Sequence, residues 1–263
     1  MIQLKNKSEL ERMKKACQIS AQALVVAGEN IRAGMTTLEL DRILHHFIVS
    51  QGAKPSFLGY GGFPGTACIS VNDEVIHGIP SSERVLREGD IVSVDVGACI
   101  GGFHGDNAFT FPVGQIGEEA KKLLDVTQKS LYLGIEAAQA GHRVGDIGAA
   151  VQALVEQNGF AVVRQYVGHG VGHNLHEDPE IPNFGRAGHG VRLVPGMTIA
   201  IEPMICQGDY KIKQLSDGWT VKTKDGGLAA HFEHSIAILK DRTEIMTRSW
   251  DDPDFDPATF SLK

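Results

Sequence analysis

The sequence predicts a mixed α/β (α+β) fold built from two related halves. Three observations support this. Each half contains a pair of amphipathic helical segments, each pair is followed by β-rich segments, and the two halves align at a constant offset. No linker separates the halves, so we expect a single domain over residues 1–250 and an acidic tail over residues 251–263.

The helices are predicted from capping signals and apolar spacing. The first is expected to begin at Ser8, because Glu11 follows three residues later, as in a capping box, and apolar residues then recur at helical spacing. The second begins at Thr36, with Glu39 in the same relation, and is ended by Gly52. Two more helices are expected over 117–140 and 144–158. Strands are expected over 68–71, 91–96, 108–111, 197–201 and 233–239.

The two halves resemble each other in sequence. Segments 34–52 and 141–159 align without a gap, so that position 34 corresponds to position 141. The same offset relates two glycines that stand six residues before a carboxylate, Gly89 and Gly196 (196 − 89 = 141 − 34). The alternative is a chance alignment of two amphipathic helices. If the duplication is real, Asp95 and Glu202 occupy equivalent strand positions and face each other across a pseudo-twofold axis.

Composition excludes several classes of protein. The 263 residues carry 25 basic and 32 acidic side chains, a formal charge of −7, which gives no general attraction to nucleic acid or anionic lipid. No apolar run reaches the roughly 18 residues of a membrane span, and no signal-peptide core is present, so we expect a cytoplasmic protein. The cysteines are scattered and are expected to be free thiols: Cys17, Cys68, Cys99 and Cys206.

Four carboxylates lie at or beside apolar strands. Asp95 lies in strand 91–96, whose two faces look apolar apart from Ser93 and this residue. Glycines at 101 and 102 predict a turn that brings Asp106 back toward it. Glu202 ends one apolar strand and Glu233 precedes another. Each acid alone is compatible with a solvated strand end. Together, converging carboxylates resist common ionisation unless a cation neutralises them, which predicts one or two divalent metals.

His169 is the candidate nitrogen ligand. It lies in a glycine-rich segment, which argues against the helix of a zinc protease even though His173 follows four residues later. A separate zinc site made of His169, His173 and His176 is an alternative. Oxygen-rich ligands with one imidazole favour manganese or iron(II) and tolerate cobalt or zinc. Two such ions sharing a water molecule would activate it and polarise a carbonyl, which is the chemistry of peptide hydrolysis.

Two further histidines and an aromatic cluster are candidates for substrate contacts. His77 and His176 are either oxyanion donors beside the metals or structural histidines. Phe57, Tyr60 and Phe63 lie among glycines, where they either belong to the core or line a pocket for an apolar side chain.

These residues resemble the metal-ligand pattern of the methionine aminopeptidases. Five candidate ligands and their flanking motifs agree in order and approximate spacing, over a region from about Lys5 to Trp250. The matching motifs are His77-Gly78-Ile79-Pro80, Gly102–Asp106, Gly168–Gly172, Pro195-Gly196-Met197 and Ile201-Glu202-Pro203-Met204. The sequence has no long insertion between His169 and Glu202 and no zinc-binding extension before the first helix. In both respects it resembles the bacterial type I enzymes.

The resemblance implies the pita-bread fold, in which pseudo-twofold helix-helix-strand units surround a central antiparallel sheet that cradles two divalent metal ions. It implies that Asp95 binds one metal, Asp106 and Glu233 bridge both, and His169 and Glu202 complete the other. A metal-bridging hydroxide would attack the first peptide carbonyl, with Glu202 moving the proton, His176 stabilising the tetrahedral intermediate and His77 contacting substrate. The implied side-chain pocket consists of Phe57, Tyr60, Phe63, Cys68 and Trp219, together with His77 and His176.

The resemblance also implies a partner and a cellular role. Such an enzyme removes the initiator methionine from nascent polypeptide N-termini, as a cytoplasmic monomer without membrane or nucleic-acid partners, and the ribosome is a candidate partner. Two positions depart from some relatives: Ile76 replaces a cysteine, and Phe57 stands where others have a sulfur-containing or small residue. Both concern the shape of the pocket.

Two other functions fit the same fold. A proline-directed aminopeptidase or dipeptidase usually carries an additional N-terminal domain, for which the residues before the first helix leave no room. A non-catalytic peptide- or RNA-binding relative typically lacks several ligands, whereas all five are present here.

Overall fold

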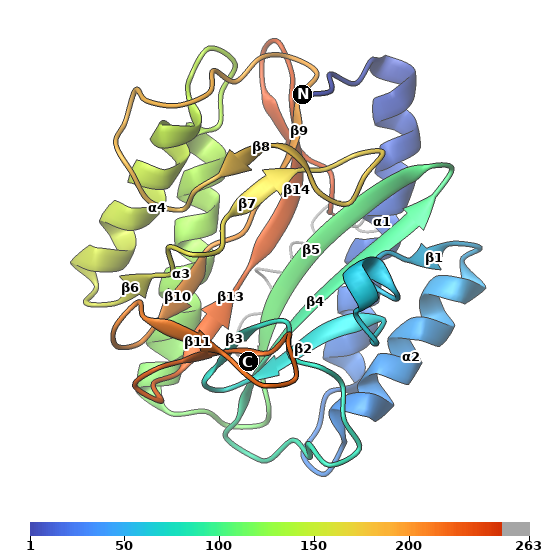
Figure 1. The fold of residues 1–263 in the computed structure, drawn as a ribbon, viewed down its shortest axis with the longest axis vertical. Helices are drawn as coiled ribbons and strands as arrows, with labels where there is room; N and C mark the ends of the chain where they lie inside the picture. Colours follow the sequence, from blue (N-terminus) through green and yellow to red (C-terminus); the bar gives the residue numbers. More distant parts are fainter. Residues whose placement is uncertain (249–263) are drawn as a thin grey trace.

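The computed structural model describes residues 1–248, so the predicted tail over 251–263 lies outside the described residues. Two pairs of helices flank a curved antiparallel sheet (Figure 1). The first pair is α1 (Lys7–Asn30) and α2 (Thr37–Ser50), and the second is α3 (Glu118–Ala137) and α4 (Val144–Gln157). Within residues 1–248, every helix is too short or too polar to cross a membrane.

The helix boundaries correct one prediction and confirm the others. The first helix does not begin at Ser8. Asn6 caps it, accepting from the Glu9 backbone N–H at 3.1 Å, while Glu9 accepts from the Asn6 backbone at 2.8 Å. Asparagine is as good an N-cap as serine, so the true capping box begins two residues earlier. The predicted box of Thr36 and Glu39 is present at the start of α2.

The main sheet has nine strands, with the order β1-β4-β5-β14-β9-β7-β8, and with β2 paired to β4 and β15 paired to β14. Its strands are β1 (Lys54–Pro55), β2 (Ala67–Val71), β4 (Ile91–Ile100), β5 (Phe103–Pro112), β7 (Gly168–Gly170), β8 (Glu177–Ile181), β9 (Thr198–Ile201), β14 (Glu233–Ile238) and β15 (Thr243–Ile245). Two three-stranded sheets complete the fold, β13 (Ala229–His231) with β10 (Met204–Cys206) and β6 (Ala161–Val162), and β11 (Ile212–Gln214) with β12 (Val221–Thr223) and β3 (Glu74–Ile76). A short 3-10 turn covers Tyr60–Gly62.

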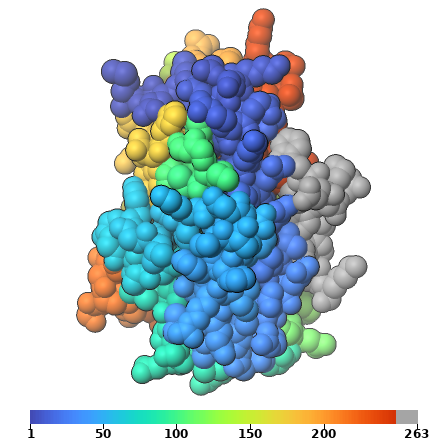
Figure 2. Space-filling view, turned by 90° about the vertical axis from the view of Figure 1, so that its right-hand side faces the viewer, coloured from blue at the N-terminus to red at the C-terminus, as the bar shows by residue number. Residues whose placement is uncertain are grey.

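The hairpin of β4 and β5 is longer than the two predicted strands. Gly101 and Gly102 both have positive φ, and Ile100 pairs with Phe103 across them, so the predicted turn is confirmed. The tip of this hairpin is fastened to the segment after β7, since the His104 backbone N–H donates to Gly172 O at 2.8 Å. Figure 2 shows this green tip against the yellow segment, with the dark blue surface of the N-terminal residues above it and a lighter blue surface below it.

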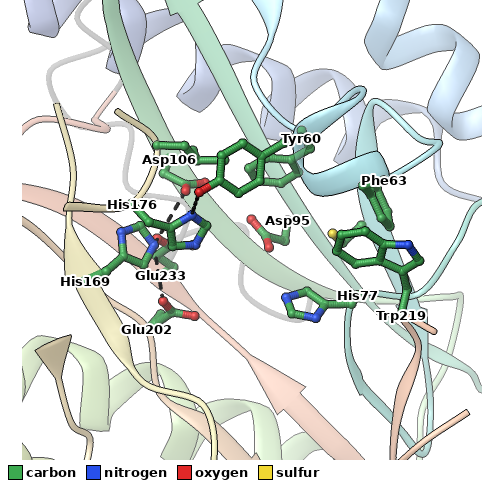
Figure 3. Close-up of a pocket in the computed structure, with 13 residues that line it drawn as sticks. Tyr60, Phe63, His77, Asp95, Asp106, His169, His176, Glu202, Trp219 and Glu233 are labelled. Carbon is green, nitrogen blue, oxygen red and sulfur yellow. Dashed lines mark hydrogen bonds and ion pairs between the residues drawn. The ribbon is translucent and has the colours of Figure 1, made fainter. Parts of the chain in front are cut away.

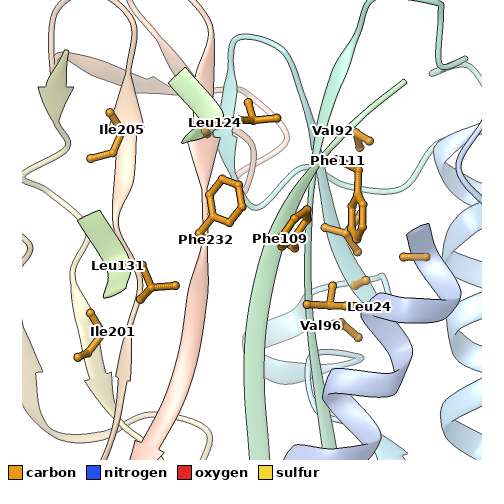
Figure 4. Packing of buried hydrophobic residues seen from close by; sticks show 14 of the residues in the cluster. Leu24, Val92, Val96, Phe109, Phe111, Leu124, Leu131, Ile201, Ile205 and Phe232 are labelled. Atoms are coloured by element: carbon orange, nitrogen blue, oxygen red, sulfur yellow. The ribbon is translucent and has the colours of Figure 1, made fainter. Parts of the chain in front are cut away.

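One face of the sheet packs against the helices and forms the main core. Val92, Val94 and Val96 of β4 lie on this face with their register partners on β5, including Phe109 and Phe111. Helix residues such as Leu24 and Leu131 complete the cluster (Figure 4). The intervening residues Ser93, Asp95 and Gly97 therefore point to the opposite face. The strand does alternate, and its polar face is the one that the helices leave uncovered.

The structure confirms the internal repeat. Helices α2 and α4 have the same length and begin at Thr37 and Val144, which are related by the predicted offset (144 − 37 = 141 − 34). An isolated bridge joins Thr36 to Val85, and another joins Arg143 to Arg192, so both ends of the bridge are shifted by this same offset. Positive-φ glycines repeat in the same way, at 34 and 141, 52 and 159, and 89 and 196. Two matching long-range bridges make a chance alignment of helices untenable.

The sheet lies close to α1 at the position before Asp106. A Cβ on Gly105 would lie 2.4 Å from the backbone nitrogen of Cys17, so only glycine allows this approach. The helix therefore supports the strand directly behind a predicted ligand.

Candidate metal centre

Strand register places three predicted ligands on the uncovered face of the sheet. Asp95 is paired with Ala108 on β5, and Glu233 on β14 is paired with the same Ala108 from the other side. Asp106 lies two residues before Ala108 and therefore points to the same face. Its partner on β4 is Gly97, which carries no side chain to fill the space. Antiparallel pairing thus brings three carboxylates together around one small residue.

The remaining predicted ligands come from the second half of the chain. Glu202 directly follows β9, and continuing the register of β9 with β14 would set it opposite Glu233. His169 lies on β7, which pairs with β9. Its Nε2 atom is 3.5 Å from Glu202 Oε1 and 3.9 Å from Asp106 Oδ2. Figure 3 shows these side chains converging with Asp95 and Glu233 on one space. All five predicted ligands are brought together.

Burial and mutual repulsion keep these carboxylates from ionising together. Burial raises the pKa of Asp106 to about 8. Burial, followed by the charge of Asp106, raises the pKa of Asp95, Glu202 and Glu233 well above the ordinary range. Four acids in this state require either protons or cations.

The hydrogen bonding of His169 leaves a lone pair directed at the carboxylates. Its Nδ1–H donates to Gly170 O at 2.8 Å, so Nε2 carries no proton in the neutral ring. Burial lowers the pKa of His169 to about 3, which keeps it neutral. A neutral imidazole whose Nδ1–H is held by a backbone carbonyl is the usual form of a histidine metal ligand.

The donor set fits divalent metal ions. Three carboxylate oxygens, Asp95 Oδ1, Asp106 Oδ1 and Glu233 Oε1, are buried without a hydrogen-bond partner among residues 1–248. A buried carboxylate oxygen without a partner destabilises the fold unless a proton, water molecule or cation binds to it. Ligand atoms of Asp106, His169 and Glu233 lie within 4.8 Å of one another. Oxygen donors with one imidazole suit hard or borderline cations.

A pocket of about 250 Å³ opens onto these ligands. Every predicted site residue lines it, and Figure 3 shows Phe63, His77 and Trp219 on the side away from His169, with Tyr60 beside His176. Its apolar wall is a cluster of Phe57, Phe63, Cys68 and Leu175 with Trp219 packed against it. Phe63 and Trp219 meet edge to face, 5.2 Å between centroids. The predicted pocket is therefore an apolar chamber with the ligands at one end.

His77 is held in a constrained conformation beside the pocket. Its φ of 59° is unusual for a residue with a Cβ, and such strain concentrates at functional sites. The next residue fixes it, because the Gly78 N–H donates to Ser70 Oγ at 3.0 Å and Gly78 O accepts from Ile69 N at 2.9 Å. Burial lowers the pKa of His77 to about 4, so the ring is neutral.

His176 faces the ligands from the segment between β7 and β8. Its ring centroid is 4.1 Å from that of His169, and its Nδ1 is 2.9 Å from Tyr60 OH. Burial lowers the pKa of His176 and raises the pKa of Tyr60, so the phenol donates to a neutral imidazole. The next residue, Glu177, forms a buried ion pair with Lys5 that anchors the segment.

The separate zinc site of three histidines is not formed. His173 is half exposed, its Nδ1 lies 3.1 Å from Gly102 O, and its ring stacks on Phe103 outside the pocket. Of the described residues, two groups have metal-ligand spacing, and neither includes His173.

Sequence reasoning missed two residues of the site. Leu175 lines the apolar wall. His231 is 1% exposed, and its Nε2 lies 3.4 Å from Glu202 Oε2. The spacing of two residues between His231 and Glu233, which directs strand side chains to one face, was the available signal. Leu175 had no local signal, because only the folded segment before β8 places it against Phe57.

The raised carboxylate pKa values predict how pH affects the metal-free protein. The folded state binds protons more tightly at these groups, so stability falls as pH rises from the unfolded pKa to the folded pKa. The buried histidines act in the opposite direction, but only up to about pH 7, where the unfolded chain has lost its histidine protons. Between pH 7 and 8.5 we expect the metal-free protein to lose on the order of 1 kcal/mol from Asp106 alone.

Thermal unfolding at pH 7 and 8.5, with and without Mn²⁺, measures this effect. The loss should disappear on metal addition and shrink in Asp106→Asn, whose amide does not titrate. A melting temperature of the metal-free protein that rises over this interval would contradict it.

Comparisons with known proteins agree with this geometry. Residues 11–240 match the model of metallopeptidase family M24. The chain is 53% identical over 247 residues to a methionine aminopeptidase of Clostridium perfringens, covering 94% of this chain and 99% of that protein. It is 52% identical to methionine aminopeptidase 1 of Bacillus subtilis, covering 94% and 100%. The crystal structure of the methionine aminopeptidase of Thermotoga maritima is similar, with a TM-score of 0.92, 47% identity, and 94% and 99% of the chains covered.

Proposed function

Because the chain belongs to metallopeptidase family M24, and within it to the methionine aminopeptidases, we propose that its five converging ligands form a two-metal centre that removes the first methionine of a polypeptide. The fold is the pita-bread fold of this family. The observation that carries the proposal is the set of three partnerless buried carboxylate oxygens, among residues 1–248, at the end of an apolar pocket. A cation site and an apolar side-chain site share one cavity.

The ligand assignment follows from position. Asp106 and Glu233 would be shared by the two metal ions, Asp95 would complete the site of one ion, and His169 and Glu202 would complete the site of the other. Manganese, iron(II), cobalt and zinc all suit this set. When bound, such a pair activates a water molecule at neutral pH and polarises the scissile carbonyl.

The apolar wall selects the first side chain. Phe57, Phe63 and Trp219 offer aromatic surfaces to a thioether, which packs favourably against ring edges. Burial raises the pKa of the Cys68 thiol, so it stays uncharged beside that chain. A volume of about 250 Å³ is enough for one amino-acid side chain.

Glu202 transfers the proton, while His176, oriented by Tyr60, and His77 donate hydrogen bonds to the substrate. Glu202 accepts the proton of the attacking water and passes it to the departing amine. Tyr60 donates to Nδ1 of His176, which leaves the Nε2–H of that histidine to stabilise the oxygen of the tetrahedral intermediate. His77, neutral and fixed by its backbone, donates to the substrate beside the scissile bond.

The proposal extends to the cellular setting. We place the protein in the cytoplasm as a monomer acting on nascent chain N-termini, in a single catalytic domain. Its four cysteines are all free thiols, which suits a reducing compartment, and the net charge of −7 offers no general attraction to anionic lipid. Because nascent chains emerge from the ribosome, the ribosome is a partner in this proposal.

Metal reconstitution tests the function. The protein is stripped, given back Mn²⁺, Fe²⁺, Co²⁺ or Zn²⁺ singly, and assayed for methionine release from Met-Ala-Ser and for cleavage of Xaa-Pro peptides. We expect no activity without metal, restoration by at least one ion, and a strong preference for Met-Ala-Ser. Preferential Xaa-Pro cleavage would replace the proposal with a proline-directed peptidase. Peptide binding without hydrolysis under every metal would replace it with a non-catalytic role.

A further inference from the structure

The buried imidazole of His231 has no role in the mechanism above. It ends β13, two residues before the ligand Glu233, and is 1% exposed. Neither ring nitrogen has a hydrogen-bond partner among the described residues, and few buried polar side chains in a folded protein are left so. The polar atom that its Nε2 faces is Glu202 Oε2, at 3.4 Å.

Glu202 therefore lies between two imidazoles. Its Oε1 atom is 3.5 Å from His169 on the ligand side, and its Oε2 atom faces His231 on the other. The carbonyl of Glu202 is held separately, since Asn183 Nδ2 donates to it at 3.0 Å. The backbone of Glu202 is thus fixed, but the rotation of its carboxylate depends on what meets its oxygens.

Two hydrogen bonds with Thr110 fix the backbone position of His231. Thr110 Oγ1 accepts from the His231 N–H at 2.9 Å and donates to His231 O at 2.8 Å. Because the hydroxyl has one proton and that proton goes to the carbonyl, Ser93 Oγ must be the donor in its 2.8 Å contact with Thr110. Ser93, Thr110 and His231 thus form a directed chain of hydrogen bonds across three strands, ending behind Glu202.

We propose that His231 is a positioning residue whose Nε2–H donates to Glu202 Oε2 and so holds the other carboxylate oxygen toward the ligands. The 3.4 Å separation suits a contact that shortens when the centre is loaded, as catalytic hydrogen bonds commonly do. This inference rests on the proposed proton transfer by Glu202. Removing His231 should let the carboxylate rotate and lower kcat, with little change in KM. Because Glu202 is also a proposed metal ligand, the affinity for Mn²⁺ should fall as well.

Three substitutions of His231 distinguish the effect of its hydrogen-bond donor from the effect of its side-chain volume. His231→Gln places an amide N–H about where Nε2 stands, His231→Asn ends one methylene short of it, and His231→Leu fills the space without a donor. We expect the Gln variant to keep kcat within about threefold, and the Asn and Leu variants to lose about 10- to 100-fold, the usual effect of losing such a support. Gln and Asn form a matched pair, since both are polar amides.

His234→Leu is the control. This histidine is similarly buried, three residues further on, and its ring nitrogens contact Thr247 and Tyr132. It should lower the melting temperature and leave kcat near the wild-type value. The measurements are kcat and KM on Met-Ala-Ser, thermal melting, and calorimetric titration of the metal-free variants with Mn²⁺.

Each outcome decides. Loss of kcat in Asn and Leu, with recovery of both kcat and Mn²⁺ affinity in Gln, supports the inference. Equal kcat in all three variants, or a Gln variant as slow as Asn, overturns it. Mn²⁺ affinity that is lost in the Gln variant also overturns it, because His231 would then be an imidazole ligand, as its 4.8 Å grouping with Glu202 and Glu233 allows. A wild-type protein that releases no methionine with any metal defeats the proposed function instead.

Discussion

Asp106→Ala is expected to abolish metal binding and hydrolysis together. Asp106 lies at the centre of the ligand group, with Oδ2 3.9 Å from His169 Nε2 and with Oδ1 buried and lacking a partner among the described residues. In the proposed assignment Asp106 would hold both metal ions, so its loss would leave both sites incomplete. We expect kcat/KM to fall by more than about 10³-fold, which corresponds to about 4 kcal/mol.

The same variant should be at least as stable as the wild type when both are metal-free. Burial raises the pKa of this carboxyl to about 8, so it is mostly protonated at neutral pH, and its Oδ1 lacks a partner among the described residues; the substitution therefore removes an unsatisfied buried polar group. Calorimetry with Mn²⁺ measures metal binding, thermal melting measures stability, and the Met-Ala-Ser assay measures hydrolysis. Asp41→Ala is the control, because this buried carboxyl accepts from the Thr66 and Ala67 backbones outside the site and should affect stability alone. Wild-type turnover in Asp106→Ala would remove this residue from the ligand set.

His176→Ala is expected to lower kcat by about 10²- to 10³-fold, or about 2.7–4 kcal/mol, the typical cost of one oxyanion donor. Metal content should stay at the wild-type level, because His176 contacts Tyr60 and the ring of His169 but supplies no ligand atom to the groups with metal-ligand spacing in the described part of the chain. KM should change little, since the hydrogen bond strengthens only as charge develops on the carbonyl oxygen.

Two companion variants make this prediction specific. His173→Ala removes a histidine three residues earlier that faces solvent and Gly102, and it should leave kcat unchanged. Tyr60→Phe removes the donor to His176 Nδ1 and should produce a smaller loss than His176→Ala, because the imidazole remains while its tautomer is no longer imposed. An unchanged kcat in His176→Ala would exclude it from the mechanism.

The four helices and the strands β2, β4, β5, β9 and β14 were predictable because local signals specify them, whereas the other strands of the described residues were not predicted. The capping box at Thr36 and the paired glycines at 101 and 102 gave correct boundaries. The error at Ser8 came from two overlapping capping boxes, of which the earlier one, Asn6 with Glu9, forms. The ligand set was predictable for a different reason. Carboxylates inside apolar strands are costly, and that cost indicates a cation from the sequence alone.

Three parts of the site had no local signal. His231 was hidden because its importance depends on the 3.4 Å approach to Glu202, which lies far from it in the chain. Leu175 joins the pocket only through the packing of the segment before β8. The pairing of Tyr60 with His176 joins two loops of opposite halves, which no periodicity describes.

The sequence by itself determined the internal repeat, the helix pairs, and the five residues able to bind metal. The tertiary structure alone decided which face of each strand those residues occupy, which nitrogen of His169 carries the proton, and which side chains stand behind Glu202. The physical reason is that the two kinds of feature depend on interactions over different separations along the chain. Capping, periodicity and the cost of an isolated buried charge act within a few residues, whereas register, tautomer and carboxylate orientation depend on atoms that meet only after distant strands have paired.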